Sequence, residues 1–503
     1  MTQFGAKIVP FSEKNEFQNW SRKPLTNRKS DAIILLAHTP PSSRGLGRSP
    51  FKAKTGVRIS VGVQKASSVW MRFFVLSAGL LDWVIIKSWQ VSIAYSHAMI
   101  KIAIVCQPSD QLLPPYQTPA AEWSYQVAGR LTADTNVTIF GRKSPTQNAS
   151  VIIEDSPFAK GKIRFQLIRT LPNAFWSMLR RAWSLFSAES RPLSASRLYY
   201  LLYSVQIAQA IRRDVYDLVH IHNLVQFVPI IRFFNPHAQI ILHCHDARLT
   251  QLDTPQTQVQ IEQCDRIFAV TDTVTKQIHE RFPATKHYCQ TQFHGVDIDQ
   301  FRPIAPSDRP NDASALYIGG FAHQDGIEEV AQAFSQLGQL YQHLQFTLIC
   351  PQPSPTTLFD QVQSQFPAEL MQRLTFINGA TASELAGQIQ MATVVINTDA
   401  IYAFNIPIVQ ASASGVPIVA VNQPGTTAIV EDKRSGFLID QGDAKALTTR
   451  ISDLLLHANV RRQMGAAGRK RVAQLFSWKK VSRSVLYSYR TLFDVEPHIG
   501  ATD

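Results

Sequence analysis

Four histidines stand near the ends of two apolar stretches that are predicted to form buried strands. His220 and His222 belong to the segment DLVHIH, and His243 and His245 belong to the segment LHCHD. Alternate residues of a strand share one face, so each pair should point to one side of its sheet. Imidazole nitrogens can bind a metal ion or exchange hydrogen bonds. No pattern of acidic ligands accompanies these histidines, so the sequence favours hydrogen bonding over a metal site.

A second candidate site lies in the stretch from Asn397 to Gly425. A buried strand ends at its start, a short helix is predicted over Ile408–Ser414, Gly415 stops that helix, and Val416–Val421 is the next predicted strand. This order of elements is typical of a parallel sheet, in which ligands bind at the carboxyl ends of the strands. The helix start at residues 405–410 is therefore expected to present free backbone N–H groups to an anion.

The chain is long enough for more than one folded domain. Its 503 residues are 45% hydrophobic and 17% charged, which is the composition of a globular protein and not of a disordered one. The five cysteines are scattered without a Cys-x-x-Cys pair. Neither a zinc site nor a disulfide framework is therefore predicted, and reduced thiols in the cytoplasm are expected.

The net charge of +13 comes mainly from the first fifth of the chain. Residues 1–98 hold 14 Lys and Arg against 4 Asp and Glu, a net +10, which leaves only +3 for the other residues. A nucleic-acid-binding protein is expected to carry its positive charge on the folded binding domain. The sequence therefore does not predict a nucleic-acid partner.

Several segments resemble, in order and spacing, the GT-B glycosyltransferases of family 4. FHGVDIDQFRP matches the family's NGVDxxxFxP linker most specifically, and DLVHIHN, LHCHD and QASASGVPIV match other family segments over about residues 99–495. The resemblance implies an α/β fold of the GT-B type, with two Rossmann-like parallel-sheet domains facing across a cleft. The implied parts are an acceptor domain over 99–300, a nucleotide-sugar domain over 301–480, and a C-terminal helix over 478–495 that crosses back to the first domain.

Residues 1–98 fall outside this resemblance. The apolar run from Val69 to Ile86 is interrupted by two charges, which makes it a weak candidate for a membrane span. Family members commonly open on a strand such as the one predicted directly after Met99. We therefore expect Met99 to be the biological start, with a peripheral extension as the alternative, and mass spectrometry of the native N-terminus decides between them.

The resemblance implies an enzyme that moves a sugar, with retention, from a nucleotide-diphosphate sugar to a glycan or lipid-linked acceptor. His245 matches the family histidine beside the transferred sugar and is the candidate catalytic residue. The alternative is a histidine that is hydrogen-bonded within the fold and has no contact with substrate. No metal or other cofactor is implied beyond the nucleotide sugar as co-substrate. The candidate donor-binding residues are Gly319, Gly320, Phe404, Asn405, Ile406 and Gln410, and the other cleft candidates are Tyr116, Gln117, Asp246, Gly295 and Tyr402.

The chain departs from the family pattern at the positions that bind the donor. Each lost charge-assisted hydrogen bond weakens binding by about 1.5–3 kcal/mol, although an amide at 410 can still bond ribose hydroxyls. Two interpretations follow: an active transferase with an atypical donor site, and a non-catalytic GT-B relative that acts as a binding or scaffolding partner. The departures are Gln117-Thr118-Pro119 for a Gly-Gly pair, Gly320 and Asp325 for the Arg and Lys that grip the diphosphate, and Tyr402 and Gln410 for two Glu.

A further segment, over residues 167–186, mixes arginines with aromatic and leucine side chains. A basic amphipathic helix of this kind either lies on an anionic membrane surface or buries its aromatic side chains in the core. The sequence therefore predicts a cytoplasmic protein, with peripheral contact at the inner face of the membrane as a further expectation.

Overall fold

Contacts along the chain divide the computed structural model into two units, Met1–Ala98 and Met99–Asp503. In the first unit, β1 (Ile8–Pro10) pairs with β2 (Ile34–Leu36), and β3 (Phe73–Ser77) pairs with β4 (Leu80–Val84). Within the described residues, no helix is long and apolar enough to cross a membrane. The structure describes residues 8–10, 34–36, 73–77, 80–84, 99–113, 118–143, 149–169, 200–252, 254–308, 312–352, 354–399 and 403–493.

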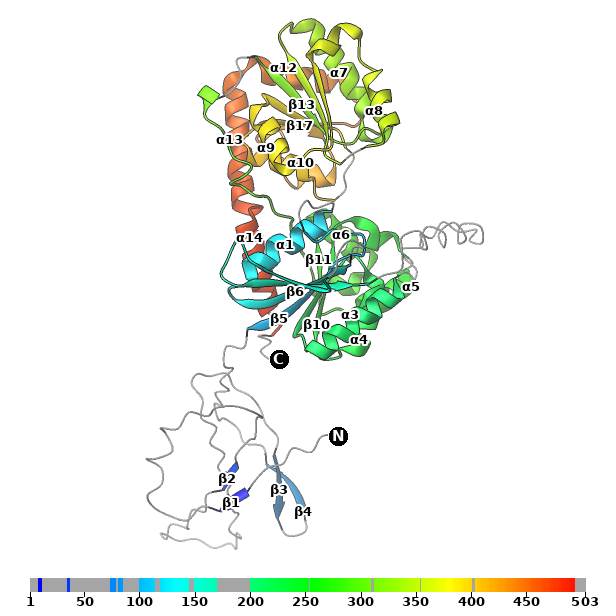
Figure 1. Ribbon diagram of the computed structural model, residues 1–503, viewed down its shortest axis with the longest axis vertical. Coiled ribbons are helices and arrows are strands. Elements are labelled where there is room, and N and C mark those ends of the chain that lie inside the picture. Colours follow the sequence, from blue (N-terminus) through cyan, green and yellow to red (C-terminus); the bar gives the residue numbers. More distant parts are fainter. Residues whose placement is uncertain are drawn as a thin grey trace, which may run out of the picture. The chain divides into compact units, whose positions relative to one another are not determined.

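The first sheet of the second unit has eight strands (Figure 1). They lie in the order β12-β11-β10-β9-β5-β6-β8-β7, and all neighbours are parallel except β7 and β8. Parallel strands are covered on both faces, which explains near-continuous apolar runs such as IKIAIV. The strands are β5 (Ile100–Val105), β6 (Thr135–Arg142), β7 (Val151–Asp155), β8 (Lys162–Ile168), β9 (Leu218–His222), β10 (Gln239–Cys244), β11 (Arg266–Ala269) and β12 (Cys289–Thr291).

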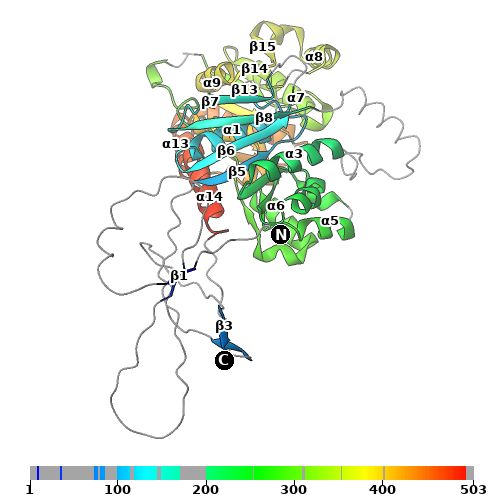
Figure 2. The same cartoon turned by 60° about the horizontal axis from the view of Figure 1, so that its bottom comes forward.

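Helix α1 (Pro119–Leu131) covers one face of this sheet and packs against β6 and β8 (Figure 2). Thr118 caps it by accepting a hydrogen bond from the Ala121 N–H at 3.2 Å, and Pro119 is the first helical residue. Proline suits that position because its missing N–H has no helical partner in any case. The other helices of this part are α3 (Leu201–Asp214), α4 (Val228–Phe234), α5 (Thr254–Ile261) and α6 (Asp272–Arg281).

The second sheet has six parallel strands in the order β15-β14-β13-β16-β17-β18. The prediction of two parallel-sheet α/β domains is therefore confirmed. The strands are β13 (Ser314–Ile318), β14 (Gln345–Cys350), β15 (Leu374–Asn378), β16 (Val394–Asn397), β17 (Ile418–Val421) and β18 (Phe437–Ile439). The helices are α7 (Ile327–Leu340), α8 (Thr356–Gln363), α9 (Ala382–Met391), α10 (Ile406–Ala413), α11 (Pro424–Thr427), α12 (Ala444–Leu456) and α13 (Ala458–Leu475).

Helix α10 corrects the sequence prediction at its start. It begins at Ile406, two residues before the predicted start, because Asn405 caps it and Pro407 fits its first turn. Its end agrees with the prediction, since Gly415 follows with a φ of +68°. Left-handed backbone of this kind is the conformation with which glycine commonly stops a helix.

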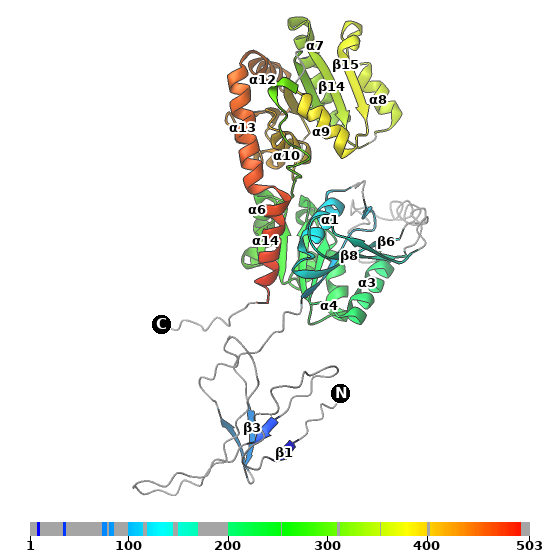
Figure 3. The ribbon, with the colours of Figure 1, turned by 60° about the vertical axis from the view of Figure 1, so that its left-hand side comes forward.

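The last helix, α14 (Trp478–Arg490), packs against α1 of the first sheet, whereas α13 packs against α10 of the second (Figure 3). Arg266 donates to the Ser488 carbonyl at 2.6 Å, and Gln290 donates to the Ser488 hydroxyl at 2.7 Å. The polar edge of α14 is thus bonded to β11 and β12. Its apolar face joins the core beneath the first sheet.

The packing of α13 predicts that two of its glycines differ in how well they tolerate replacement by alanine. A Cβ at Gly465 would lie 2.1 Å from the Gly415 carbonyl oxygen, whereas a Cβ at Gly468 would lie 3.6 Å from Ser412. Alanine favours a helix over glycine by about 1 kcal/mol at either position. We expect Gly465→Ala to destabilise the fold by about 1–3 kcal/mol and Gly468→Ala to be neutral or slightly stabilising. Urea unfolding of both variants measures the difference, and equal midpoints would contradict it.

Candidate functional site

The four histidines predicted on β9 and β10 meet beneath α1. His222 and His243 lie opposite each other in the parallel register, and the His243 and His245 rings stack with centroids 4.1 Å apart. The indole of Trp123, a fully buried residue of α1, lies with its centroid 4.8–6.4 Å from all four imidazoles. The sequence predicted that each pair of histidines shares one face of the sheet. The structure shows that the Trp123 indole packs against all four of them.

Two separate hydrogen-bond chains link these rings. In one, the Tyr489 hydroxyl of α14 lies 2.7 Å from His220 Nδ1, and His220 Nε2 lies 3.2 Å from His243 Nδ1. In the other, Ser124 Oγ of α1 lies 3.0 Å from His222 Nε2, and His222 Nδ1 lies 2.7 Å from His245 Nε2. Two helices that lie far apart in the sequence, α1 and α14, therefore both form hydrogen bonds to the histidines.

Burial keeps the histidines neutral. Loss of solvation holds the pKa values of His220, His243 and His245 well below their ordinary range and lowers the pKa of His222 to about 3. His294, which lies between the Gly295 and Pro119 carbonyls, has its pKa lowered to about 4 for the same reason. Each neutral ring carries a single N–H, so its two nitrogens play different parts.

A metal ion is the other chemistry that this cluster suggests. Nitrogens of His220, His222 and His243 all lie within 4.8 Å of one another. Two nitrogens bound to one tetrahedral zinc ion, at about 2.0–2.1 Å each, also lie within that limit, so the spacing by itself is compatible with a metal. All three residues also take part in the hydrogen-bond chains. The arrangement fits hydrogen bonding better than metal binding.

The backbone around His245 is fixed by Asn223, which follows β9. Asn223 has a φ of +58°, and its Oδ1 accepts a hydrogen bond from the His245 N–H at 2.8 Å. Asn tolerates left-handed backbone better than most residues do. The predicted cleft residue Asp246 has another task, because its carboxylate accepts from the Arg248 N–H and pairs with the Arg248 guanidinium at 2.6 Å.

At the second sheet, a pair of carboxylates closes the loop after β13. The Gly320 N–H donates to Asp399 Oδ1 at 3.1 Å, and the Ala322 N–H donates to Asp325 Oδ2 at 2.9 Å. Tyr317 completes the loop by donating to the Gly320 carbonyl at 2.6 Å. Burial, and then the charge of Asp325, raise the pKa of Asp399 to about 7. The loop after β13 therefore carries acidic side chains, whereas the family resemblance implies Arg and Lys at this place.

The expected anion seat at the start of α10 is only partly present. Pro407 has no N–H, and the Ile408 N–H donates to Asn405 Oδ1 at 3.3 Å. The start of α10 therefore offers fewer free N–H groups than predicted, because the cap uses that of Ile408 and Pro407 has none. The Asn405 amide donates to Asn397 Oδ1 at 2.8 Å, so this buried side chain is engaged inside the domain.

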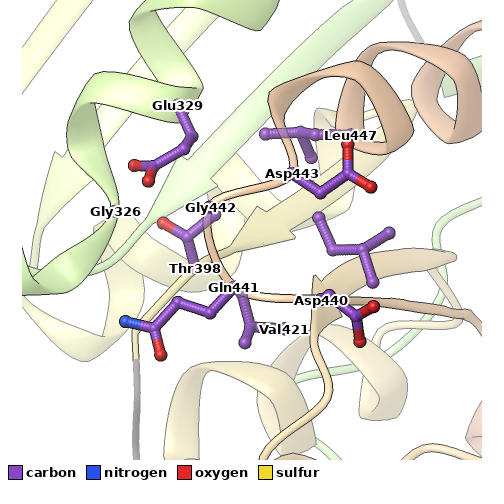
Figure 4. Close-up of a pocket in the computed structure, with 10 residues that line it drawn as sticks. Gly326, Glu329, Thr398, Val421, Asp440, Gln441, Gly442, Asp443 and Leu447 are labelled. Carbon is purple, nitrogen blue, oxygen red and sulfur yellow. The ribbon is translucent and has the colours of Figure 1, made fainter.

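A hollow near the loop that follows β13 is also lined by acidic residues (Figure 4). Glu329 of α7, together with Asp440 and Asp443 from the loop between β18 and α12, lines it beside Thr398 and Gln441. No Lys or Arg is among the residues that line it in the described part of the chain. The residues that line the hollow therefore provide no positively charged side chain to bind a diphosphate.

Two family models match adjoining parts of the chain. The model described as "Glycosyltransferase Family 4" matches residues 125–300, and the one described as "Glycosyl transferases group 1" matches residues 301–471. Together they cover about two thirds of the chain and join at the predicted linker. The chain belongs to GT-B glycosyltransferase family 4. The histidine cluster thus lies in the half of the transferase that the first model matches.

Known relatives of this transferase are distant. Spore coat protein SA of Bacillus subtilis (strain 168) is 22% identical over 310 residues, which are 57% of this chain and 81% of the relative. The D-inositol 3-phosphate glycosyltransferase of Nocardioides sp. (strain ATCC BAA-499 / JS614) is 26% identical over 312 residues, 55% of this chain and 67% of the relative. Anabaena Alr3699/HepE, solved in complex with UDP-glucose, has a similar fold, with a TM-score of 0.54, 14% identity, and coverage of 78% of this chain and 100% of HepE.

The other candidate residues of the transferase lie in different surroundings. Gly295 is not among the glycines with left-handed backbone, and a Cβ there would lie 2.2 Å from the Trp478 ring. Phe404 is buried against Phe293, His294 and Phe476, while Ile406 is half-buried at the start of α10. Gly319 lies at the end of β13, where its N–H donates to the Ile349 carbonyl. Tyr116, Gln117 and Tyr402 lie outside the described residues, as does most of 167–186.

Sequence reasoning missed several titratable residues of the transferase. Asp399 and Tyr317 belonged to no motif, although the position of Asp399, two residues after the buried strand β16, could have marked it. Glu122 of α1 is another such residue, and burial raises its pKa to about 7. The same effect raises the pKa of Asp110 to about 6, despite the hydrogen bond that it accepts from Thr118. Such shifts depend on burial that a linear pattern does not reveal.

Proposed function

We propose that this protein is a retaining glycosyltransferase of the hexosyltransferase type, which uses a nucleotide-diphosphate sugar and a glycan or lipid-linked acceptor. Membership of family 4 supports the reaction class. The Nocardioides relative is named as a D-inositol 3-phosphate glycosyltransferase, so its name gives the molecule to which that protein transfers a sugar. The complex of HepE with UDP-glucose supports a nucleotide sugar as the donor.

The observation that carries the proposal is a pair of unpaired acceptors at candidate site residues. His245 Nδ1 and Gln410 Oε1 are both buried, and neither has a hydrogen-bond partner in the described part of the chain. An unsatisfied buried acceptor costs about 1–3 kcal/mol, which a ligand hydroxyl recovers on binding. A nucleotide sugar carries such hydroxyls on both its sugar and its ribose.

The roles of the chain's own residues follow from this chemistry. A neutral imidazole at His245 offers a lone pair to a sugar hydroxyl and adds no positive charge next to a sugar that becomes electron-poor in the transition state. Asn223 holds the backbone of His245, and Gln410 is the candidate partner of the ribose. We further propose that no metal takes part, because the convergent histidines are engaged in their hydrogen-bond chains.

The acidic loop favours a second candidate, a non-catalytic relative that binds another protein or a glycan. Asp325 and Asp399 lie where cations are expected to hold the diphosphate. The raised pKa of Asp399 partly offsets this, because a carboxyl group with a pKa of about 7 is uncharged for part of the time at neutral pH. A wild-type chain that binds no nucleoside diphosphate at millimolar concentration would support the non-catalytic role.

Location at the inner face of the membrane, through residues 167–186, is also proposed. The support is the mixture of arginine and aromatic residues in that segment. Co-sedimentation of the full chain with anionic and neutral vesicles tests it, since equal recovery with both would oppose a basic docking segment.

The test of the enzyme function is sugar release or transfer from a panel of UDP-, GDP- and ADP-sugars. We expect wild type to act on at least one of them and His245→Ala to lower kcat/KM about 10–100-fold, because one hydrogen bond to the sugar is lost. The affinity for the free nucleoside diphosphate should not change. The matched control is His457→Ala, which removes an exposed histidine between α12 and α13. Equal losses in both variants would argue against a sugar contact at His245.

A further inference from the structure

The direction of each hydrogen bond in the Ser124–His222–His245 chain is determined by its first member. Ser124 Oγ lies 2.6 Å from the Ala120 carbonyl oxygen, which can only accept, so the single hydroxyl hydrogen points there. The thiol of Cys106 donates to Ser124 Oγ at 3.3 Å. Towards His222 Nε2, at 3.0 Å, Ser124 Oγ can therefore only accept, and His222 must carry its hydrogen on Nε2.

The next link passes this direction on to His245. His222 is neutral, so a hydrogen on Nε2 leaves a lone pair on Nδ1. His245 Nε2, 2.7 Å from that lone pair, must donate to it and therefore carries the single hydrogen of its own neutral ring. His245 Nδ1 is left as an acceptor, and it is the buried nitrogen that has no partner in the described part of the chain.

We infer that Ser124 and His222 are positioning residues that hold His245 as its Nε2–H tautomer, so that Nδ1 accepts a hydrogen bond from a hydroxyl of the bound sugar. This inference rests on the proposed transferase function. The group that binds at His245 Nδ1 must be a hydrogen-bond donor, and any free hydroxyl of a sugar ring meets that requirement.

The second chain provides a contrast within the same cluster. The Tyr489 hydroxyl has His220 Nδ1 as its hydrogen-bond partner in the described residues, and a buried hydroxyl is stabilised by donating to it. His220 then donates through Nε2 to His243 Nδ1, which leaves His243 with an N–H on Nε2. The stacked rings of His243 and His245 therefore hold opposite tautomeric roles, with a free donor on one and a free acceptor on the other.

The direct test is the 15N spectrum of histidine-labelled full chain at neutral pH, with His245 assigned from its loss in His245→Asn. We expect a protonated Nε2 and an unprotonated Nδ1 in wild type. Ser124→Ala removes the acceptor for His222 and should give His245 a mixture of tautomers. Ser124→Thr keeps a hydroxyl that can bond the carbonyl four residues back, and it should restore the wild-type signal. A wild-type His245 protonated on Nδ1, or an unchanged spectrum in Ser124→Ala, overturns the inference.

The matched control is Ser335→Ala, because Ser335 of α7 donates to the Ala331 carbonyl at 2.7 Å in the same helical geometry. It should leave the His245 signal and the kinetics unchanged. Ser124→Ala should lower kcat/KM for a neutral sugar donor about tenfold, with unchanged affinity for the free nucleoside diphosphate. Failure of the two proposals can be told apart. If the wild-type chain shows the expected His245 tautomer but transfers no sugar, the proposed function is wrong and the positioning role of Ser124 and His222 stands. If it transfers sugar but His245 is protonated on Nδ1, the positioning role is wrong and the proposed function stands.

Discussion

Lowering the pH from 6 to 5 is expected to reduce the free energy of unfolding by about 3 kcal/mol. The main cause is the set of buried histidines, each with a folded-state pKa below its unfolded value of 6.5. The unfolded chain therefore binds more protons than the folded chain below pH 6.5, and stability falls as the pH falls. The five residues are His220, His222, His243, His245 and His294.

Three carboxyl groups act in the opposite direction over the same range. Burial raises the pKa values of Glu122 and Asp399 to about 7 and of Asp110 to about 6. The folded state therefore binds protons at these sites before the unfolded state does, which stabilises it as the pH falls towards about 4.5. Each group changes the stability by about 1.4 kcal/mol per pH unit, and the histidines outnumber the carboxyls by two.

Urea unfolding at several pH values between 7.5 and 5 measures this dependence. His294→Gln removes one of the five groups and should make the slope shallower by about 1.4 kcal/mol per pH unit. Phe233→Ala removes an exposed apolar side chain without a titratable group, so its slope should equal that of wild type. A stability that stays level or rises from pH 6 to 5 would show that the histidine cluster is not buried in its neutral form.

Replacement of Trp478 by alanine is expected to destabilise the fold by about 3–5 kcal/mol. This first residue of α14 is 1% exposed, and its indole covers Gly295 so closely that a Cβ there would lie 2.2 Å from the ring. The centroid of the His294 ring lies 4.8 Å from that of the indole, and the backbone N–H of Trp478, which alanine would keep, donates to the Val296 carbonyl. A large cavity would therefore open at the point where α14 joins the linker segment.

Tyr487→Ala is the matched control for this substitution. Tyr487 belongs to the same helix but is 72% exposed, so its loss should change stability by no more than about 0.5 kcal/mol. Denaturant unfolding of the two variants and wild type under one condition gives the comparison. If Trp478→Ala unfolds at the same midpoint as Tyr487→Ala, the indole does not hold α14 in place.

The loop after β13 depends on the fit between positions 320 and 325. A Cβ at Gly320 would lie 2.0 Å from Asp325 Oδ2, so a larger side chain does not fit at 320 while Asp325 closes the loop. Glycine at 320 is therefore compatible with the position of the Asp325 carboxylate, whereas a larger residue at 320 would displace it. Asp399 adds a third polar contact to the same loop.

Much of the fold could be predicted from the sequence alone because local patterns determine it. Apolar runs such as Val394–Asn397 mark strands of a parallel sheet, and Gly415 marks the end of α10. The placement of His243 and His245 on one face follows from the alternation of side chains along a strand. Family segments in the right order, above all the linker that begins at Phe293, predicted two such sheets.

The tertiary structure alone decided which chemistry these residues have. Ser124 and Tyr489 lie far from the histidines in sequence, yet their hydroxyls determine which nitrogen of each ring carries the hydrogen. The raised pKa of Asp399 needs the burial that the loop after β13 provides. The absence of a side chain at Gly295 leaves room for the Trp478 ring, which lies far away in the sequence. A linear pattern records residue types and local periodicity, whereas tautomers, pKa values and close contacts depend on neighbours that only folding brings together.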